Sequence, residues 1–290
     1  MKTIGFLNSA PRGPHYDQHV AAFQAGLNEA GCVEGRDVKI ISRWAQGKYA
    51  DLPKLAADLV KRKVDVLATT GGTVSALAAI RATKTIPIIF VSGFDPRKAG
   101  LLKSGNAEGV NVFTTESGRK RLALLRQLTP KAKKAAVLLR PGTYVYRREK
   151  EEAKKVGLIV VEAHEQADFA PAYAAAVKKG AGAIIVCADP YFTSHRKKLI
   201  ALAAKYRLPA AYPWREYVEE GGLMSFGPNL ADAYRHVGQK AGNIIQGYAK
   251  GRKQVKKHKT SEFELVINAK TAGQFGLTIP EAWGKRAEVV

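Results

Sequence analysis

The chain has 290 residues, of which 46% are hydrophobic and 25% charged, a balance that supports two folded lobes and excludes a disordered polymer. Lys and Arg number 47 against 25 Asp and Glu, a net charge of +22. The basic residues are spread over predicted helix faces, and the dense run at 250–259 has no DNA- or RNA-binding motif beside it. We therefore expect a solvated basic surface and no nucleic-acid partner. No apolar run approaches the roughly 20 residues of a membrane span.

The first part of the chain alternates apolar runs with helical patterns, as in a parallel sheet covered by helices. Strands are predicted at 4–7, 38–42, 64–69, 86–92 and 110–113. The helices between them have recognisable ends: Gly31 stops the first, Asp51 caps the second, and the third covers 74–83.

The same alternation restarts after residue 113. The predicted elements are helix 116–128, strand 135–139, helix 145–156, strand 158–162, helix 170–179, strand 183–188, helix 194–207, strand 209–212, helix 214–219, strand 223–226, helix 228–247, strand 262–268 and helix 271–275. Right-handed crossovers make each half an α/β sandwich.

Candidate ligand-binding residues follow the strands, because ligands of such sheets bind beyond the carboxyl ends of the strands. Small hydroxyl, amide and glycine residues dominate the first half, and aromatic and charged residues the second. The candidates are Asn8, Ser9, Thr70, Gly71, Gly72, Thr73, Ser92, Asp95, Arg140, Thr143, Tyr144, Asp189, Tyr191, Phe192, Tyr212, Trp214 and Phe226.

Thr70-Gly-Gly-Thr73 opens a predicted helix and suits a carboxylate, because backbone N–H groups, hydroxyls and the helix dipole all favour an anion there. An equally good interpretation is that Thr73 caps the helix and the glycines turn the chain. No Gly-Lys-Ser/Thr follows, so this is not a phosphate loop.

Charged residues come from both halves, and the aromatic candidates come from the second. Asp95 and Asp189 each precede a proline; one could hold a ligand ammonium, or each could cap a helix, which is the more frequent role. Any one of the aromatic candidates is more often a core residue, but their clustering predicts at least two stacking contacts. Arg140, if it faces the ligand, would favour a second acidic group on it.

Enzyme signatures are missing from the sequence. It has no Gly-x-Ser-x-Gly turn, no metalloprotease spacing around His15 and His19, and no nucleophile–base pair. Cys32 and Cys187 are predicted to be unpaired thiols. We predict a binding protein with no cofactor and no metal site.

Several blocks resemble the ABC transporter substrate-binding family often labelled TrpX-like, and the match runs nearly end to end. They are 28–35, 44–49, 52–59, 70–73, 212–216, 221–225, 263–268 and 276–280. The resemblance implies a type I periplasmic-binding-protein fold, with two Rossmann-like lobes, a multi-strand hinge and a ligand cleft. It also implies an amino acid or aromatic carboxylate ligand, closure of the lobes around it, and a membrane permease as partner.

The sequence departs from the family pattern in three places. Members usually carry an export signal, which is absent from this numbering. The resemblance alone implies a periplasmic or membrane-anchored protein, with the leader missing from this numbering. Arg140-Pro-Gly-Thr143 replaces an Asn-Pro loop rich in asparagine, and the segment 104–109 is condensed. The arginine favours an acidic ligand.

These observations predict a monomeric solute receptor of α/β class. The N-terminal lobe is 1–113, with 228–258 returning to it, and the C-terminal lobe is 114–227. Residues 259–290 hold a hinge strand and a terminal helix whose lobe is left open. The first alternative is a ligand-sensing regulator or a basic nucleic-acid-associated protein, and the lack of a helix-turn-helix before Thr3 argues against it. The second alternative is an α/β enzyme.

Overall fold

The computed structural model describes residues 1–143, 145–247, 263–284 and 287–290. The chain divides into two compact units. Unit 1 is Met1–Phe113 with Asn229–Ser261, and unit 2 is Thr114–Pro228 with Glu262–Val290. No helix in the described residues is both long and apolar enough to cross a membrane.

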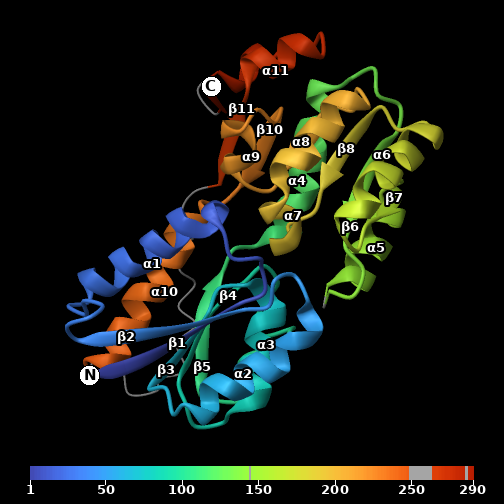
Figure 1. Cartoon of the computed structure of the whole chain (residues 1–290). Helices are drawn as coiled ribbons and strands as arrows, with labels where there is room; N and C mark the ends of the chain where they lie inside the picture. The colour runs from blue at the N-terminus through green and yellow to red at the C-terminus, as the bar shows by residue number, and fades with distance from the viewer. Residues whose placement is uncertain (144, 248–262, 285–286) are drawn as a thin grey trace. The chain divides into compact units, whose positions relative to one another are not determined.

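Unit 1 contains a five-stranded parallel sheet in its described residues, with the order β2-β1-β3-β4-β5. The strands are β1 Lys2–Asn8, β2 Val38–Trp44, β3 Val66–Thr69, β4 Ile88–Ser92 and β5 Ala107–Asn111. The helices are α1 Asp17–Glu29, α2 Leu52–Lys61, α3 Gly72–Ala82 and α10 Leu230–Ile245, with short 3₁₀ turns at Pro14–Tyr16 and Tyr49–Asp51. α1 and α10 cover one face of the sheet, and α2 and α3 the other (Figure 1).

The register of these strands brings their carboxyl ends to one edge. Leu7 pairs with Thr69, and Thr69 in turn pairs with Phe90. Asn8 and Thr70 therefore leave the sheet side by side, and Ser92 ends the next strand. This edge positions the candidate residues of the first half.

α1 and α10 lie side by side although about 200 residues separate them in sequence (Figure 1). Glycines make this approach possible: a Cβ on Gly26 would lie 1.9 Å from the carbonyl oxygen of Arg235, and one on Gly238 would lie 2.0 Å from that of Phe23. The backbones of α1 and α10 are thus too close at these two positions to admit any side chain. This close packing holds α10 in unit 1.

Unit 2 contains a seven-stranded sheet in its described residues, with the order β12-β11-β10-β9-β8-β6-β7 and one antiparallel pair, β10 with β11. The strands are β6 Ala135–Leu139, β7 Ile159–Glu162, β8 Ala183–Val186, β9 Ala210–Tyr212, β10 Met224–Gly227, β11 Glu264–Ile267 and β12 Ala287–Val289. The helices are α4 Thr114–Leu128, α5 Tyr146–Lys155, α6 Phe169–Lys178, α7 Pro190–Ser194, α8 Arg196–Lys205, α9 Arg215–Glu219 and α11 Ala269–Gln274, with 3₁₀ turns at Gln166–Asp168 and Glu281–Trp283.

One predicted strand lies at a shifted position, and two short elements were not predicted. The helix expected at 194–207 is α8, and the short α7 that precedes it, capped by Asp189, was not predicted. The strand expected at 110–113 lies at Ala107–Asn111 and stops where the Asn111 side chain accepts a hydrogen bond from the Phe113 N–H. β12 was not predicted. The basic linker 251–260 and the start of the strand predicted at 262–268 lie outside the described residues.

Candidate functional site

Asn8 is the centre of a buried polar cluster at the carboxyl edge of the unit 1 sheet. Its amide nitrogen donates to the Thr70 hydroxyl at 3.0 Å and to the Tyr234 hydroxyl at 3.1 Å, and its amide oxygen accepts from the Ala10 N–H at 2.8 Å. The Asn8 side chain is fully buried. It therefore ties the ends of β1 and β3 to α10.

The two glycines of Thr-Gly-Gly-Thr are required by the geometry. A Cβ on Gly71 would lie 2.2 Å from the Ser9 nitrogen, and Gly72 has a φ of +77°, in the left-handed region that favours glycine. The Ser9 hydroxyl donates to the Gly71 carbonyl at 2.8 Å. Both glycines thus let the chain turn tightly into α3, directly beside the end of β1.

The predicted capping role of Thr73 is not observed. Gly71 is the N-cap of α3 and no side chain caps the helix. The Thr73 hydroxyl lies 2.9 Å from the Ser92 hydroxyl, which itself donates to the Phe94 carbonyl at 2.7 Å. Since the Ser92 proton is used in that bond, Thr73 is the donor to Ser92 and keeps its lone pairs free to accept.

The first turn of α3 has donors suited to an anion. The N–H groups that begin a helix have no partner within it, and the helix dipole places partial positive charge at the same end. The Ser75 hydroxyl, in the same turn, is buried and lacks a hydrogen-bond partner within the described residues. The turn can therefore bind a carboxylate.

Tyr234 belongs to this cluster and was not among the predicted residues. Its hydroxyl donates to the Thr70 carbonyl at 3.0 Å, and its ring lies 5.1 Å from that of the buried His19. The one sequence feature that could have indicated its role is that it is a tyrosine on the otherwise apolar face of the helix predicted at 228–247. Its partners were not predictable, because they come from the other end of the chain.

Asp95 supports a turn. Its carboxylate accepts from the N–H groups of Arg97 and Lys98, at 2.8 and 3.3 Å. No helix begins in the described residues directly after Asp95, so it stabilises a turn and not the helix start that the sequence allowed as the alternative to ammonium binding.

Arg140 and Asp189 end the neighbouring strands β6 and β8 in unit 2 and lie close together. The closest guanidinium nitrogen and carboxylate oxygen are 3.9 Å apart, and the Arg140 Nε donates to the His164 carbonyl at 3.1 Å. Asp189 also caps α7 by accepting from the N–H groups of Tyr191 and Phe192. The charge of Arg140 is thus already met by a buried carboxylate, which weakens the expectation of a second acidic group on the ligand.

The predicted aromatic residues of unit 2 fall into two groups. Phe192 and Tyr212 are fully buried; Phe192 packs edge-to-face on Phe169, and Tyr212 stacks on Tyr217 with centroids 4.6 Å apart. These two are core residues, against the expectation of ligand contact.

Of the other aromatic candidates in the described residues, one is partly exposed and two are buried. Tyr191 is partly exposed, with its hydroxyl accepting from the Gln166 N–H. Trp214 and Phe226 are 6% and 4% exposed, and Phe226 stacks on the exposed Phe263. Thr143 donates to the Arg140 carbonyl at 3.3 Å, and Tyr144 lies outside the described residues.

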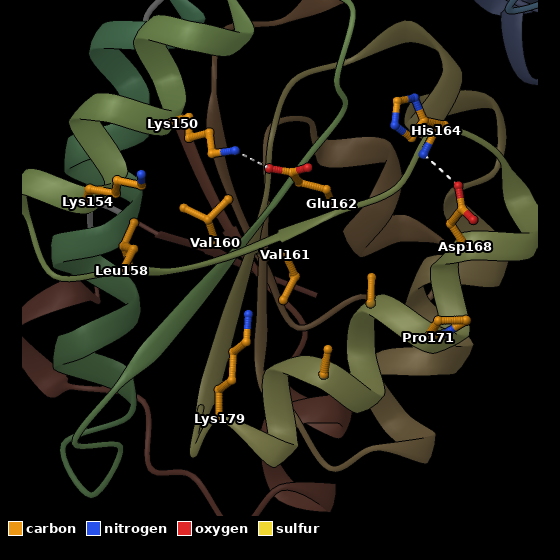
Figure 2. A pocket seen from close by; sticks show the side chains of 12 residues that line it. Lys150, Lys154, Leu158, Val160, Val161, Glu162, His164, Asp168, Pro171 and Lys179 are labelled. Carbon is orange, nitrogen blue, oxygen red and sulfur yellow. Dashed lines mark hydrogen bonds and ion pairs between the residues drawn. The ribbon is translucent and has the colours of Figure 1, made fainter.

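A groove of about 720 Å³ runs beside the edge strand β7, between α5 and α6 (Figure 2). Lys150 reaches across it to Glu162 at 2.8 Å, and Asp168 accepts from the His164 N–H at 2.8 Å. None of the predicted site residues line this groove. Lys150, Glu162 and Asp168 already have partners in the protein, so we assign this groove no ligand.

Metal chemistry has no support in the described residues, where no three His, Cys, Asp or Glu side chains gather in a group suited to an ion. Cys32 and Cys187 are both unpaired and buried. Burial raises the pKa of the Cys187 thiol well above its ordinary value. Such a thiol is a poor nucleophile at neutral pH.

The two parallel-sheet α/β units, with helices on both faces, define the type I periplasmic-binding-protein fold. Residues 11–290 match the model of the ABC transporter substrate binding protein family, and the chain belongs to that family. It is therefore a substrate-binding protein, as predicted from the sequence.

Known relatives agree with this assignment. A tyrosine-binding protein of Clostridioides difficile (strain R20291) is 29% identical over 281 residues, covering 93% of this chain and 79% of that protein. The structure of an ABC domain in complex with L-Trp from Streptococcus pneumoniae is 26% identical, with a TM-score of 0.84 and coverage of 100% and 99%. A conserved domain protein from Vibrio cholerae is 27% identical, with a TM-score of 0.81 and 99% of each chain covered.

Proposed function

We propose that this protein binds an amino acid or a related small carboxylate, and that the first turn of α3 holds the carboxylate. The observation that carries the proposal is the arrangement of Ser9, Gly71, Gly72 and Thr73 around that turn, with the unpartnered Ser75 hydroxyl beside it. Relatives described as tyrosine-binding or as complexed with L-Trp support an aromatic amino acid as the first choice.

Thr73 has a specific part in this proposal. In the structure its hydroxyl donates to Ser92. A ligand carboxylate is a stronger acceptor, since hydrogen bonds to charged groups contribute about 1.5–3 kcal/mol against about 0.5–1.5 for neutral ones. The Thr73 hydroxyl therefore turns to the ligand, and Ser92 keeps its bonds to Phe94. Backbone N–H groups of the same turn supply the remaining donors.

In unit 2, we propose Tyr191 and Trp214 as contacts for a flat side chain. Tyr191 is the partly exposed ring, and Trp214 follows β9 at the same carboxyl edge. Asp189 remains the candidate for a ligand ammonium, because a partly desolvated amine needs an ionic partner. Phe226 is kept as a weaker candidate because Phe263 already covers its ring.

The remaining parts of the proposal concern the cellular role. We propose a non-enzymatic receptor that acts outside the cytoplasm as a monomer and delivers its solute to an ABC permease. Family membership supports the permease and the location. The buried, protonated thiols and the lack of a catalytic set support a binding role.

The test is a thermal-shift screen of the purified chain against amino acids, aromatic acids and dicarboxylates. A true ligand at a hundred times its Kd adds about 2.7 kcal/mol to the free energy of unfolding. Hits are then measured by calorimetry in Thr73→Val, which we expect to bind about tenfold more weakly.

Thr83→Val is the matched control. Thr83 lies at the opposite end of α3, where its hydroxyl accepts from the N–H groups of Thr85 and Ile86. It should lose stability but keep its affinity. Equal affinities of Thr73→Val and wild type would show that the ligand carboxylate does not bind at the first turn of α3. Tyr191→Ala tests the contact in unit 2 separately.

A further inference from the structure

A cavity of about 410 Å³ lies inside unit 2, between the helices α4 and α5 and the sheet. Its walls are mostly apolar, and Leu122, Val137, Leu139, Ala153, Val156 and Ile185 are among the lining residues. None of the seventeen predicted site residues line it. Its size and apolar walls are those of small-molecule sites, which hold a few convergent polar groups in an apolar surface.

Arg121 is the buried cation of this cavity and is 2% exposed, whereas Arg119 and Arg148, which also line it, are exposed. Its Nε donates to the Phe226 carbonyl at 3.1 Å, and a terminal nitrogen donates to the Ser117 hydroxyl at 3.2 Å. Burial lowers its pKa to about 10, so it stays charged at neutral pH. Both of these acceptors are neutral, and within the described residues no carboxylate forms an ion pair with Arg121. A buried cation without a counter-charge is costly, and a bound anion would supply one.

Glu149 lines the same cavity and is the nearest candidate for that counter-charge. Its side chain forms no hydrogen bond or ion pair with any described part of the chain. Desolvation and the negative charge of Asp189 raise its pKa to about 7, although Arg121 opposes that shift. A large fraction of Glu149 is therefore neutral at physiological pH and can donate a hydrogen bond. Arg121 and Glu149 together offer one cation and one carboxyl donor to a guest.

We propose that this cavity binds a small monocarboxylic acid with an apolar body, such as an arylalkanoate, with its carboxylate on Arg121 and Glu149 and its body against Leu122, Val137 and Ile185. The site is independent of the solute site proposed at α3. A monoanion compensates the charge of the buried Arg121, and an apolar body fills the apolar remainder. An ammonium group on the guest would be repelled by Arg121, so the preferred class differs from amino acids.

The test uses 3-phenylpropanoate, 3-phenylpropylamine and phenylalanine as probes, with the full chain labelled at its Ile, Leu and Val methyl groups. We expect saturable shifts of the Leu122, Val137 and Ile185 methyls with 3-phenylpropanoate, and at least tenfold weaker effects with the other two. Thr73→Val should leave these shifts unchanged. Shifts confined to unit 1 would assign the acid to the solute site and overturn the proposal, as would equal binding of the amine.

Ala153→Phe fills the cavity and should abolish these shifts, with Ala153→Leu as the milder substitution if the first variant does not fold. Val177→Phe is the matched control, because Val177 is 42% exposed on α6 of the same unit. Retained binding in both folded Ala153 variants would also refute the site. Binding of 3-phenylpropanoate without any amino acid binding would keep the cavity and reject the solute proposal.

Discussion

The guanidinium of Arg140 lies over the ring of Tyr191, with its central carbon 4.3 Å from the ring centroid. The two residues leave the adjacent strands β6 and β8, and Asp189 holds the same arginine from the side, 3.9 Å away. Arg140, which the sequence analysis predicted to contact the ligand, thus holds the ring of Tyr191 in place. The orientation of Tyr191 therefore depends on an arginine of the neighbouring loop.

Arg140→Lys should therefore destabilise the protein by about 1 kcal/mol, because lysine keeps the charge but not the planar stacking on Tyr191 or the Nε bond to His164. Urea denaturation measures the change. Lys134→Arg is a control at the opposite end of β6. A destabilisation no larger than that of this control would show that the stacking contributes nothing.

Gly238→Ala should destabilise the protein by about 3 kcal/mol or more, since its new Cβ would lie 2.0 Å from the Phe23 carbonyl oxygen and must separate α1 from α10. Gly273→Ala is the matched control: nothing lies within 4 Å of its added Cβ in α11. There, replacing a helical glycine should stabilise by about 0.5–1 kcal/mol. The two thermal melts should move in opposite directions, and parallel shifts would contradict the close crossing.

Glu149→Gln should change the pH dependence of stability. The pKa of Glu149 is raised from 4.5 to about 7, so the folded state retains a proton that the unfolded state loses in this window. Wild type therefore loses stability relative to the variant as pH rises from about 4.5 to 7. We expect Glu149→Gln to be more stable by about 1–2 kcal/mol at pH 8 and equal at pH 4, by urea denaturation.

Glu151→Gln is its control, because Glu151 is exposed on the same helix. It should change stability equally little at both pH values. The same gain for Glu149→Gln at pH 4 and pH 8 would show that ionisation is not its cause.

Arg215→Gln should loosen the carboxyl-terminal strands of unit 2. Arg215 in α9 forms ion pairs with Glu264 of β11 at 3.0 Å and with Glu288 of β12 at 2.8 Å. Since the group is partly exposed, we expect a loss of about 1 kcal/mol and faster amide exchange in β12. Arg36→Gln, which breaks the exposed pair with Asp37, is the control and should change neither the stability nor the amide exchange of β12. Equal exchange rates in Arg215→Gln and wild type would show that the ion pairs of Arg215 do not hold β12.

The parallel strands were the easiest part to predict from sequence, because buried strands are continuous apolar runs. Strand β6 was placed at the residues where it is found. β12 was missed because Ala287–Val289 is three residues long and mostly exposed, so its pairing with β11 rather than its composition makes it a strand. The same holds for α7, which is short and depends on the Asp189 cap.

The candidate site was predictable in position and less so in roles. Strand ends located Asn8, Ser9, Thr70 and Ser92 at one edge, because parallel register alone brings them together. Tyr212 is buried in the core and Tyr191 is partly exposed, and no local sequence pattern predicts this difference. Tyr234 entered the cluster through the packing of α10, a contact that single-sequence periodicity does not encode.

The return of α10 to unit 1 also determines when each unit can form during synthesis. Met1–Phe113 emerges from the ribosome with the face that α10 covers still open, including the narrow groove at Gly26. Unit 2 likewise lacks β11 and β12 until Glu264 and the residues after it have been made. Both units are thus completed only by the final part of the chain. A nascent chain stalled before residue 230 therefore presents to chaperones and proteases a unit 1 sheet with one face uncovered and a unit 2 sheet without β11 and β12.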